Sequence, residues 1–229
     1  MIIGFDADDT LWHNEDGFQA TTRTFEGLLR SWADPDEVGA RLFTIEKRNL
    51  NRYGYGVKAF TLSMIEAAID ISDGNIDTAH LQMIIELGHH LLDRPAELID
   101  GVVDVLEEVG RNHTLMIITK GDLYHQLARI DSSGLKDYFW RTEVVAYKDP
   151  ATYRELLGQH DILPRDFVMI GNSLPSDVFP VIEIGGRGIH IPYHVTWAME
   201  HADTDAANSH NAPTLDSLAK LPAFLADWV

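Results

Sequence analysis

The stretch MIIGFDADDT, residues 1–10, places an apolar segment directly before three carboxylates. The segment "MIIGF" is too short for a helix and does not alternate with polar residues, which is typical of a strand buried on both faces of a parallel sheet. Asp6, Asp8 and Asp9 follow at once, with Thr10 behind them. Because like charges this close repel one another, the sequence indicates a partner that compensates them.

Further segments have the same character along the chain. Apolar strand-like runs occur in TLMIITKG (114–121), RTEVVAYKD (141–149), DFVMIGNS (166–173) and GRGIHIPY (186–193). Helical patterns separate them in LIDGVVDVLEEVG (98–110), DPATYRELLGQH (149–160), PSDVFPVIEIGG (175–186, where Pro180 counts against a regular helix) and TLDSLAKLPAFLADWV (214–229). Strands that alternate with helices predict an α/β fold with a doubly wound parallel sheet.

One segment departs from this alternation, because a crossover between parallel strands needs only about 10–15 residues. Residues 16–94 contain no strand-like run, and their apolar spacing predicts helices in FQATTRTFEGLLRSWA (18–33), PDEVGARLFTIEKRNLNRYG (35–54), VKAFTLSMIEAAID (57–70) and TAHLQMIIELGHHLLD (78–93). We therefore expect an inserted all-helical domain over 16–94, and a catalytic core formed by 1–15 and 95–229.

The composition excludes several classes of protein. The 229 residues are 45% hydrophobic, contain no cysteine and carry a formal charge of −18. The charge argues against unspecific binding to nucleic acid or to an anionic membrane, and the lack of cysteine excludes disulfides and thiol catalysis. Without a signal-peptide pattern or a membrane-spanning run, we expect a soluble, cytoplasmic protein. The oligomeric state stays open.

Polar side chains follow each predicted strand, at the edge where open parallel sheets bind ligands. They are Asp6, Asp8, Asp9 and Thr10; then Thr119 and Lys120; then Lys148; and finally Asn172, Ser173, Ser176 and Asp177. Each group alone is weak evidence, since a solvated turn, a surface lysine or a helix cap explains it as well or better. Their joint placement at one edge is what indicates a site.

The chemistry of these groups explains the crowding of carboxylates. Asp6 and Asp177 can hold Mg²⁺, which prefers oxygen ligands. An ionised Asp6 can attack phosphorus, and Asp8 can protonate the leaving oxygen and then deprotonate water. Thr119 and Lys148 would bind the phosphoryl oxygens and offset charge in the transition state.

In this order of motifs the sequence resembles the haloacid dehalogenase-like hydrolases. The resemblance rests on "DADDT", Thr119, Lys148 and "GNSLPSD", and it covers essentially the whole chain. It implies a Rossmann-like core with an inserted helical cap, Mg²⁺ and an aspartyl intermediate. By the resemblance Asp6 is the nucleophile and Asp8 the general acid and base.

The resemblance also implies how the metal is held. The Asp8 main-chain carbonyl joins Asp6 and Asp177 as a ligand. Asn172 stands where the family often has Asp, so we expect it to orient a metal-bound water. Asp9 replaces a common Gly, and we interpret it as a solvated or supporting acid.

Several functions and residues are left open by the sequence. The favoured function is hydrolysis of a small phosphorylated metabolite; the alternatives are a sugar phosphomutase, a 2-haloacid dehalogenase, a signalling receiver domain and a non-catalytic phospho-ligand-binding protein. Asp8 favours phosphoryl chemistry over dehalogenation, because displacing halide from carbon requires no proton. The side chains without an assigned role are Lys120 (toward phosphate or solvent), Trp12 (packing or substrate), His194 and Trp197 (site entrance or surface), and His89 and His90 (packed or exposed).

Overall fold

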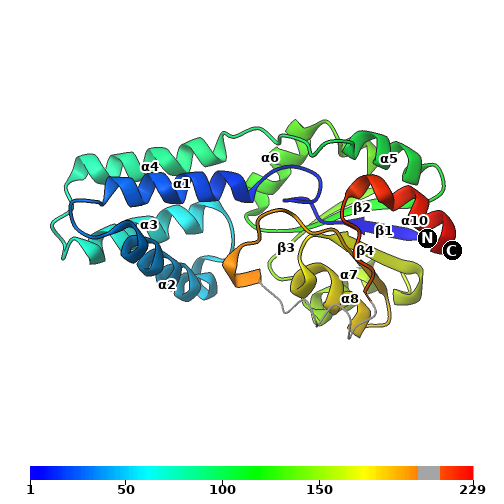
Figure 1. Ribbon diagram of the computed structural model, residues 1–229. Helices are drawn as coiled ribbons and strands as arrows, with labels where there is room; N and C mark the ends of the chain where they lie inside the picture. Colours follow the sequence, from blue (N-terminus) through cyan, green and yellow to red (C-terminus); the bar gives the residue numbers. More distant parts are fainter. Residues whose placement is uncertain (201–211, 229) are drawn as a thin grey trace. The chain divides into compact units, whose positions relative to one another are not determined.

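The computed structural model describes residues 1–200 and 212–228, and it divides into two compact units. The first unit comprises Met1–Glu15, Ala96–Lys120 and the chain from Gln126 onward. The second comprises Asp16–Pro95 together with Gly121–His125, a short segment that the sequence analysis left in the core. Figure 1 shows the strands in the first unit and α1–α4 in the second.

The first unit is built on a parallel sheet in the order β3-β2-β1-β4-β5. The strands are β1 (Ile2–Phe5), β2 (Thr114–Lys120), β3 (Arg141–Val145), β4 (Phe167–Gly171) and β5 (Arg187–His190). The central strand β1 pairs with β2 and β4, so that Phe5 lies opposite Ile117 on one side and Ile170 on the other. The loops after β1, β2 and β4 therefore leave the sheet at the same edge.

Alternate residues of the strands pack into two hydrophobic cores, one on each face of the sheet. Leu115 and Ile117 join the core beneath α5 (Val102–Gly110) and α10 (Leu221–Trp228). Met116 and Ile118 join the core beneath α7 (Pro150–Gln159) and α8 (Phe179–Glu183). This two-sided burial explains the continuous apolar runs in the sequence and confirms the α/β fold with helices on both faces (Figure 1).

The second unit is helical and has a hydrophobic core of its own. It contains α1 (Glu15–Leu28), α2 (Pro35–Tyr53), α3 (Val57–Ile71) and α4 (Thr78–Leu92). Helix α1 begins before the predicted stretch and ends at Leu28, so the prediction of helix as far as Ala33 is wrong. The main chain folds into turns there: the Trp32 N–H donates to the Leu29 carbonyl at 2.9 Å.

Two helical segments differ from what the sequence suggested. Helix α6 (Leu123–Ser133) was not predicted; Asp122 precedes it and accepts the N–H of His125 at 2.9 Å, as an N-cap does. The segment around Pro180 is split into a π-helix, Leu174–Val178, and α8. Pro180 lies in the first turn of α8, where a missing N–H costs no helical hydrogen bond.

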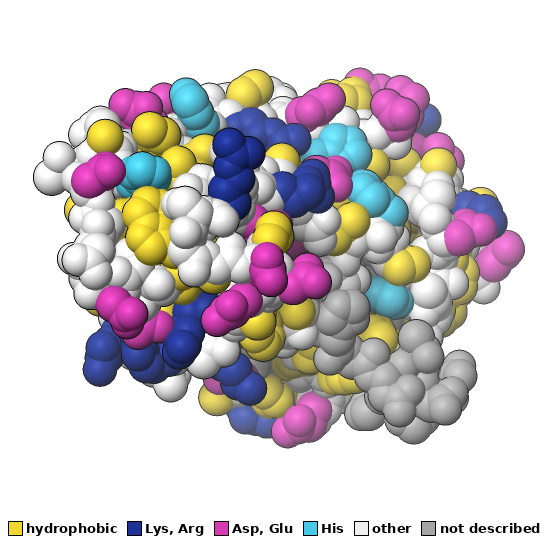
Figure 2. All heavy atoms as spheres, turned by 60° about the vertical axis from the view of Figure 1, so that its left-hand side comes forward, with side chains coloured by type: hydrophobic (Ala, Val, Ile, Leu, Met, Phe, Trp, Pro, Cys, Tyr) yellow, Lys and Arg dark blue, Asp and Glu magenta, His cyan; other side chains and the backbone are white. Residues whose placement is uncertain are grey.

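The described helices include none that is both long and apolar enough to cross a membrane. Figure 2 shows acidic, basic and hydrophobic side chains interspersed on the face that it presents. A continuous basic stripe would be typical of nucleic-acid binding. The absence of nucleic-acid and membrane partners stays a prediction from the charge of −18.

Candidate active site

The loop after β1 is a tight turn that fixes the first acidic cluster. The Asp6 N–H donates to the Ile170 carbonyl at 2.8 Å, so Asp6 is still tied to β4. The Leu11 N–H donates to the Ala7 carbonyl at 2.8 Å, which closes a helical turn over the cluster. Asp9 has φ of 62°, in the left-handed region where glycine is usual and Asp is tolerated.

Asp6, Lys148 and Asp177 form a buried cluster at the carboxyl edge of the sheet. Lys148 Nζ donates to Asp6 Oδ1 and, at 2.6 Å, to Asp177 Oδ1. The side chains of Lys148 and Asp177 are 1% and 0% exposed. The structure therefore brings together three of the predicted site residues from three separate segments of the chain.

The shape of the chain after β4 sets the position of Asp177. Asp177 lies in the π-helix, its Oδ2 accepts the Ser173 N–H at 3.0 Å, and its own N–H donates to the Ser173 carbonyl at 2.8 Å. It also packs against Gly171, where an added Cβ would meet Asp177 Oδ2 at 2.2 Å. Gly171 thus leaves the space that the carboxylate occupies.

Thr10 connects the loop after β1 to Asn172. The Thr10 hydroxyl accepts the Asn172 N–H at 3.2 Å, and both Asp6 Oδ2 and Asn172 Oδ1 lie 3.4 Å from its oxygen. Thr119 is buried at the same edge, two residues past Ile117, the partner of Phe5. The phosphate-binding role of Thr119 and the water-orienting role of Asn172 stay predictions.

Asp8 is held by donors on both of its carboxylate oxygens. Trp12 Nε1 donates to Oδ1 at 2.7 Å, and Gln126 Nε2 donates to Oδ2 at 2.7 Å. Arg129 Nη1 lies 3.2 Å from Oδ1. The Asp8 side chain keeps 23% of its surface exposed, so its carboxylate is fixed yet still accessible.

The sequence pattern did not predict a role for Gln126 and Arg129. They are three residues apart on α6, so they lie on the same face of the helix. The available signal was two polar side chains on a helix that directly follows a strand end. Their approach to Asp8 depends on how α6 packs, which a single sequence does not reveal.

The structure gives Lys120 and Trp12 definite partners. Lys120 Nζ donates to Ser176 Oγ at 2.8 Å and forms an ion pair with Glu200, a residue that the sequence did not predict at the site. Trp12 is fully buried and faces Asp8 and the core. Whether Lys120 contacts phosphate and whether Trp12 contacts substrate stay predictions.

Asp9 is buried, so the solvated alternative of its interpretation is wrong and the supporting alternative fits. Its carboxylate accepts the main-chain N–H groups of Asn14 (2.8 Å) and Glu15 (3.0 and 3.1 Å), at the start of α1. Burial raises the pKa of Asp9 to about 7, although these two hydrogen bonds lower it. Asp9 therefore acts as a structural cap.

The loop after β5 lies beside the loop after β1. His13 Nδ1 is 2.6 Å from the Tyr193 hydroxyl oxygen, and the rings of Tyr193 and His194 are 4.1 Å apart. His194 thus belongs to an aromatic group next to the loop after β1. Whether it lines the site entrance stays a prediction, as it does for Trp197.

Burial and the ion pairs of Lys148 together set the electrostatics of the cluster. Burial raises the pKa of Asp6 to about 8, Lys148 opposes the rise, and Asp177 adds to it. Burial alone would lower the pKa of Lys148, but Asp177 and Asp6 raise it well above its usual range. The lysine is therefore an ammonium ion, and it holds two acids that would otherwise repel one another.

Comparison with known proteins identifies the family. The profile of the haloacid dehalogenase-like hydrolases matches residues 1–181. The chain belongs to this family. A comparison with curated proteins found no match.

Solved structures of related hydrolases share the fold. A haloacid dehalogenase-like family hydrolase from Xanthomonas campestris is 39% identical, with a TM-score of 0.86 over 99% of this chain and 91% of that one. A 2-haloacid dehalogenase from Pseudomonas syringae is 22% identical (TM-score 0.63, 100% and 99% covered). A Bacillus subtilis structure described as a HAD hydrolase bound to magnesium is 18% identical (TM-score 0.64, 98% and 97% covered). Because matches include proteins described as dehalogenases and as phosphatases, they do not decide the reaction.

The residues of this hydrolase fit Mg²⁺, the metal that the family generally uses. In residues 1–200 and 212–228, no three His, Cys, Asp or Glu side chains gather as a metal site. Mg²⁺ usually needs only one or two carboxylates besides water. The carboxylates of Asp6 and Asp177 already converge on one cationic group, the Lys148 ammonium. Both would offer oxygen atoms as metal ligands. Two converging carboxylates of this kind suit a hard divalent cation.

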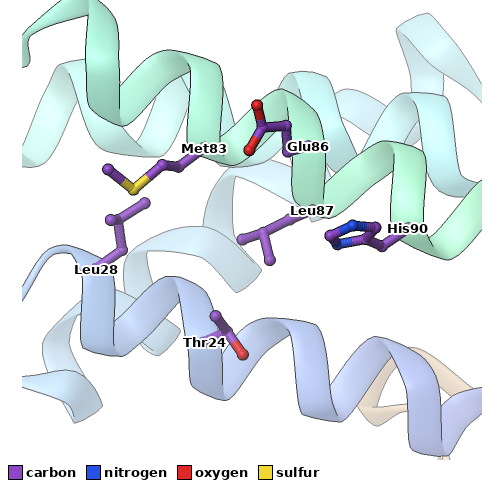
Figure 3. Close-up of a pocket in the computed structure, with 6 residues that line it drawn as sticks. All are labelled: Thr24, Leu28, Met83, Glu86, Leu87 and His90. Carbon is purple, nitrogen blue, oxygen red and sulfur yellow. The ribbon is translucent and has the colours of Figure 1, made fainter.

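A hollow of about 320 Å³ lies elsewhere, between α1 and α4 of the helical unit. Figure 3 shows its lining side chains: Thr24, Leu28, Met83, Glu86, Leu87 and His90. His89 and His90 are both exposed. The hollow contains none of the predicted site residues.

Proposed function

We propose that this hydrolase is an Mg²⁺-dependent phosphatase that cleaves phosphomonoesters through an aspartyl-phosphate on Asp6. The observation that carries the proposal is the pair of aspartates two residues apart with different surroundings. Asp6 lies in the buried cluster with Lys148 and Asp177, whereas Asp8 is fixed by Trp12, Gln126 and Arg129. One acid suits attack and the other suits proton transfer.

In the first step a carboxylate oxygen of Asp6 forms a bond to phosphorus as the ester P–O bond breaks. Asp8 gives its proton to the leaving oxygen, so the product is a neutral alcohol. Lys148 supplies positive charge beside Asp6, where negative charge builds up on the phosphoryl group. Thr119 would donate its hydroxyl to a phosphoryl oxygen.

In the second step a water oxygen attacks the phosphorus of the aspartyl-phosphate. Asp8, now ionised, takes a proton from that water as the Asp6–phosphorus bond breaks. Inorganic phosphate leaves, the Asp6 carboxylate is restored, and Asp8 is protonated again, so the cycle balances.

Asp6, Asp177 and the Asp8 carbonyl are the groups that would hold Mg²⁺. The ion would supply positive charge that keeps Asp6 ionised beside a phosphate dianion. Thr10 contacts both Asp6 and Asn172, and would keep the amide of Asn172 next to this set.

The substrate we propose is a small phosphorylated metabolite. Lids that close over an active site select substrates and exclude large polymers, and the helical unit is the part of the chain that would act in this way. The main chain on both sides of the insertion is paired within the core: His13 donates to the Glu97 carbonyl (2.9 Å), and Ile99 to that of Leu11 (3.0 Å). Any hinge would therefore lie outside these paired residues, in 14–16 and 94–96.

A dehalogenase is the second candidate, because a 2-haloacid dehalogenase is among the solved structures that share the fold. Dehalogenation uses an aspartate nucleophile but needs no proton donor for halide. The purified chain should be assayed with 4-nitrophenyl phosphate, a panel of phosphorylated metabolites and 2-chloropropionate, with and without Mg²⁺. Phosphate release that depends on Mg²⁺ supports the proposal, while chloride release alone would replace it with dehalogenation. Exchange between sugar-phosphate isomers would indicate a mutase.

A further inference from the structure

We propose that Gln126 and Arg129 of α6 are positioning residues that orient the Asp8 carboxylate for proton transfer. The inference rests on the proposed function, because it concerns the residue that acts as acid and base there. Gln126 binds Oδ2 of Asp8 and Arg129 lies against Oδ1, so one helix reaches both oxygens.

The two side chains are buried, which is unusual for polar groups of this size. Gln126 is 4% and Arg129 is 6% exposed. Arg and Gln rarely lose their water unless hydrogen bonds or an opposite charge replace it, and the only acid that contacts Arg129 among the described residues is Asp8. The charge of Arg129 is therefore matched to Asp8.

Further contacts anchor these side chains to the two loops of the site. Arg129 donates to Asn14 Oδ1 and, at 3.1 Å, to the His13 carbonyl, and its guanidinium lies 5.6 Å from the ring centre of Trp12. Gln126 Nε2 also donates to the Lys120 carbonyl at 3.1 Å. Asp8 is thereby tied to the loop after β1 and to the end of β2.

This arrangement restricts how the Asp8 carboxylate can turn. With a donor on each oxygen, rotation of the carboxylate breaks at least one hydrogen bond, while its exposed part stays open to a leaving group. Proton transfer depends strongly on such fixed geometry. Asp6 has different partners, Lys148 and Thr10, so loss of Gln126 should affect proton transfer more than nucleophilic attack.

The test measures how phosphorylation of the full chain depends on the leaving group. Rapid-quench single-turnover rates are taken with aryl phosphates from 4-nitrophenyl to phenyl phosphate, for the parent chain, Gln126→Met, Gln126→Glu and Arg129→Met. Nitrophenolate leaves without a proton, whereas phenolate benefits from one. We expect Gln126→Met to slow phenyl phosphate roughly 10- to 100-fold and 4-nitrophenyl phosphate much less.

Gln159→Met is the matched control, since Gln159 lies on α7 and its amide bonds only the exposed Glu155 among the described groups. The double variant Asp8→Asn/Gln126→Met should be no slower than Asp8→Asn alone, because Gln126 acts through Asp8. Circular dichroism verifies that the variants fold. If the Met variants do not fold, the same rate comparison is made with the isosteric Gln126→Glu, because its carboxylate oxygen cannot donate a hydrogen bond to Asp8.

Two results would overturn the inference, and they distinguish failure of the positioning role from failure of the proposed function. If the parent forms a phosphoenzyme but the folded variants slow every leaving group equally, or their effects add to that of Asp8→Asn, then Gln126 and Arg129 are only structural. If the parent chain forms no phosphoenzyme with any aryl phosphate, the proposed function fails and this inference fails with it.

Discussion

Asp8 and Asp6 are separated by one residue, yet their surroundings differ at the level of single atoms. Lys148 binds Asp6 in a buried cluster, while an indole, an amide and a guanidinium surround Asp8. This difference assigns them different chemistry, since a nucleophile must stay ionised beside a cation and an acid–base group must remain accessible. The predictions at this scale concern Asp8.

Asp8→Asn removes the proton that Asp8 would transfer but keeps the volume of the side chain. We expect turnover of alkyl phosphates to fall roughly 10²–10⁴-fold. Attack on an aryl phosphate should partly survive, because its leaving group needs little protonation. The aspartyl-phosphate should then persist, since its hydrolysis lacks a base, and stopped-flow with 4-nitrophenyl phosphate should show a burst followed by a slow phase. Parent-like turnover of both classes would reduce Asp8 to a turn residue.

At the scale of elements, the position of Asp177 in the π-helix after β4 depends on the space that Gly171 leaves. Gly171→Ala would place a Cβ 2.2 Å from Asp177 Oδ2, so the carboxylate must move. We expect a loss of about 1–3 kcal/mol in the free energy of unfolding, and weaker Mg²⁺ binding in titration calorimetry.

The matched control for that substitution is Gly158→Ala in α7. No atom lies within 4 Å of the added Cβ there, and alanine favours a helix, so the free energy of unfolding should stay the same or rise by up to about 1 kcal/mol. If Gly171→Ala behaves like the control, the account of how Asp177 is placed is wrong.

Helix α2 carries a carboxyl that should make stability depend on pH. Burial raises the pKa of Glu46 to about 7 in the folded chain, from 4.5 in the unfolded one. Between these values the folded chain keeps a proton that the unfolded chain releases, so the stability contribution of Glu46 is lost as pH rises through this window.

Glu46→Gln removes this titration and should stabilise the chain at pH 8 but not at pH 4.5. Because Glu46 is partly exposed, we expect a gain on the order of 1 kcal/mol in the free energy of unfolding at pH 8. Urea denaturation at the two pH values measures it, with the exposed Glu108→Gln as control. An equal effect at both pH values would contradict the assignment.

The sequence predicted the sheet and the groups at its carboxyl edge because both depend on local pattern. A doubly buried strand is a continuous apolar run, and its last residue marks the edge, so Asp6, Lys148 and Asp177 could be placed near one another. The contacts of α6 depend on packing across the core, which is why Gln126 and Arg129 were missed. Similarly, the burial of Asp9 and the pairing of Lys120 with Glu200 depend on how loops fold over one another.

At the scale of the whole molecule, Mg²⁺ should couple the separate loops of the site. A cation held by Asp6 and Asp177 would bind the folded chain and not the unfolded one, which raises stability by about 2.7 kcal/mol at a concentration of 100 Kd. We expect Mg²⁺ to raise the Tm in differential scanning calorimetry and EDTA to reverse the rise. Asp177→Asn should lose the response. An unchanged Tm together with full activity in EDTA would refute the metal dependence.

The central claim is that phosphate becomes covalently attached to Asp6, and rapid-quench mass spectrometry tests it most directly. The full chain is mixed with 4-nitrophenyl phosphate and Mg²⁺, quenched in acid within milliseconds, digested and sequenced by tandem mass spectrometry. Asp8→Asn prolongs the intermediate, and Asp6→Asn is the negative control. The account predicts one added phosphoryl group on the peptide that contains residues 1–10, at Asp6, and none in Asp6→Asn. Phosphate release without any phosphorylated peptide, or a phosphoryl group on another residue, would contradict it.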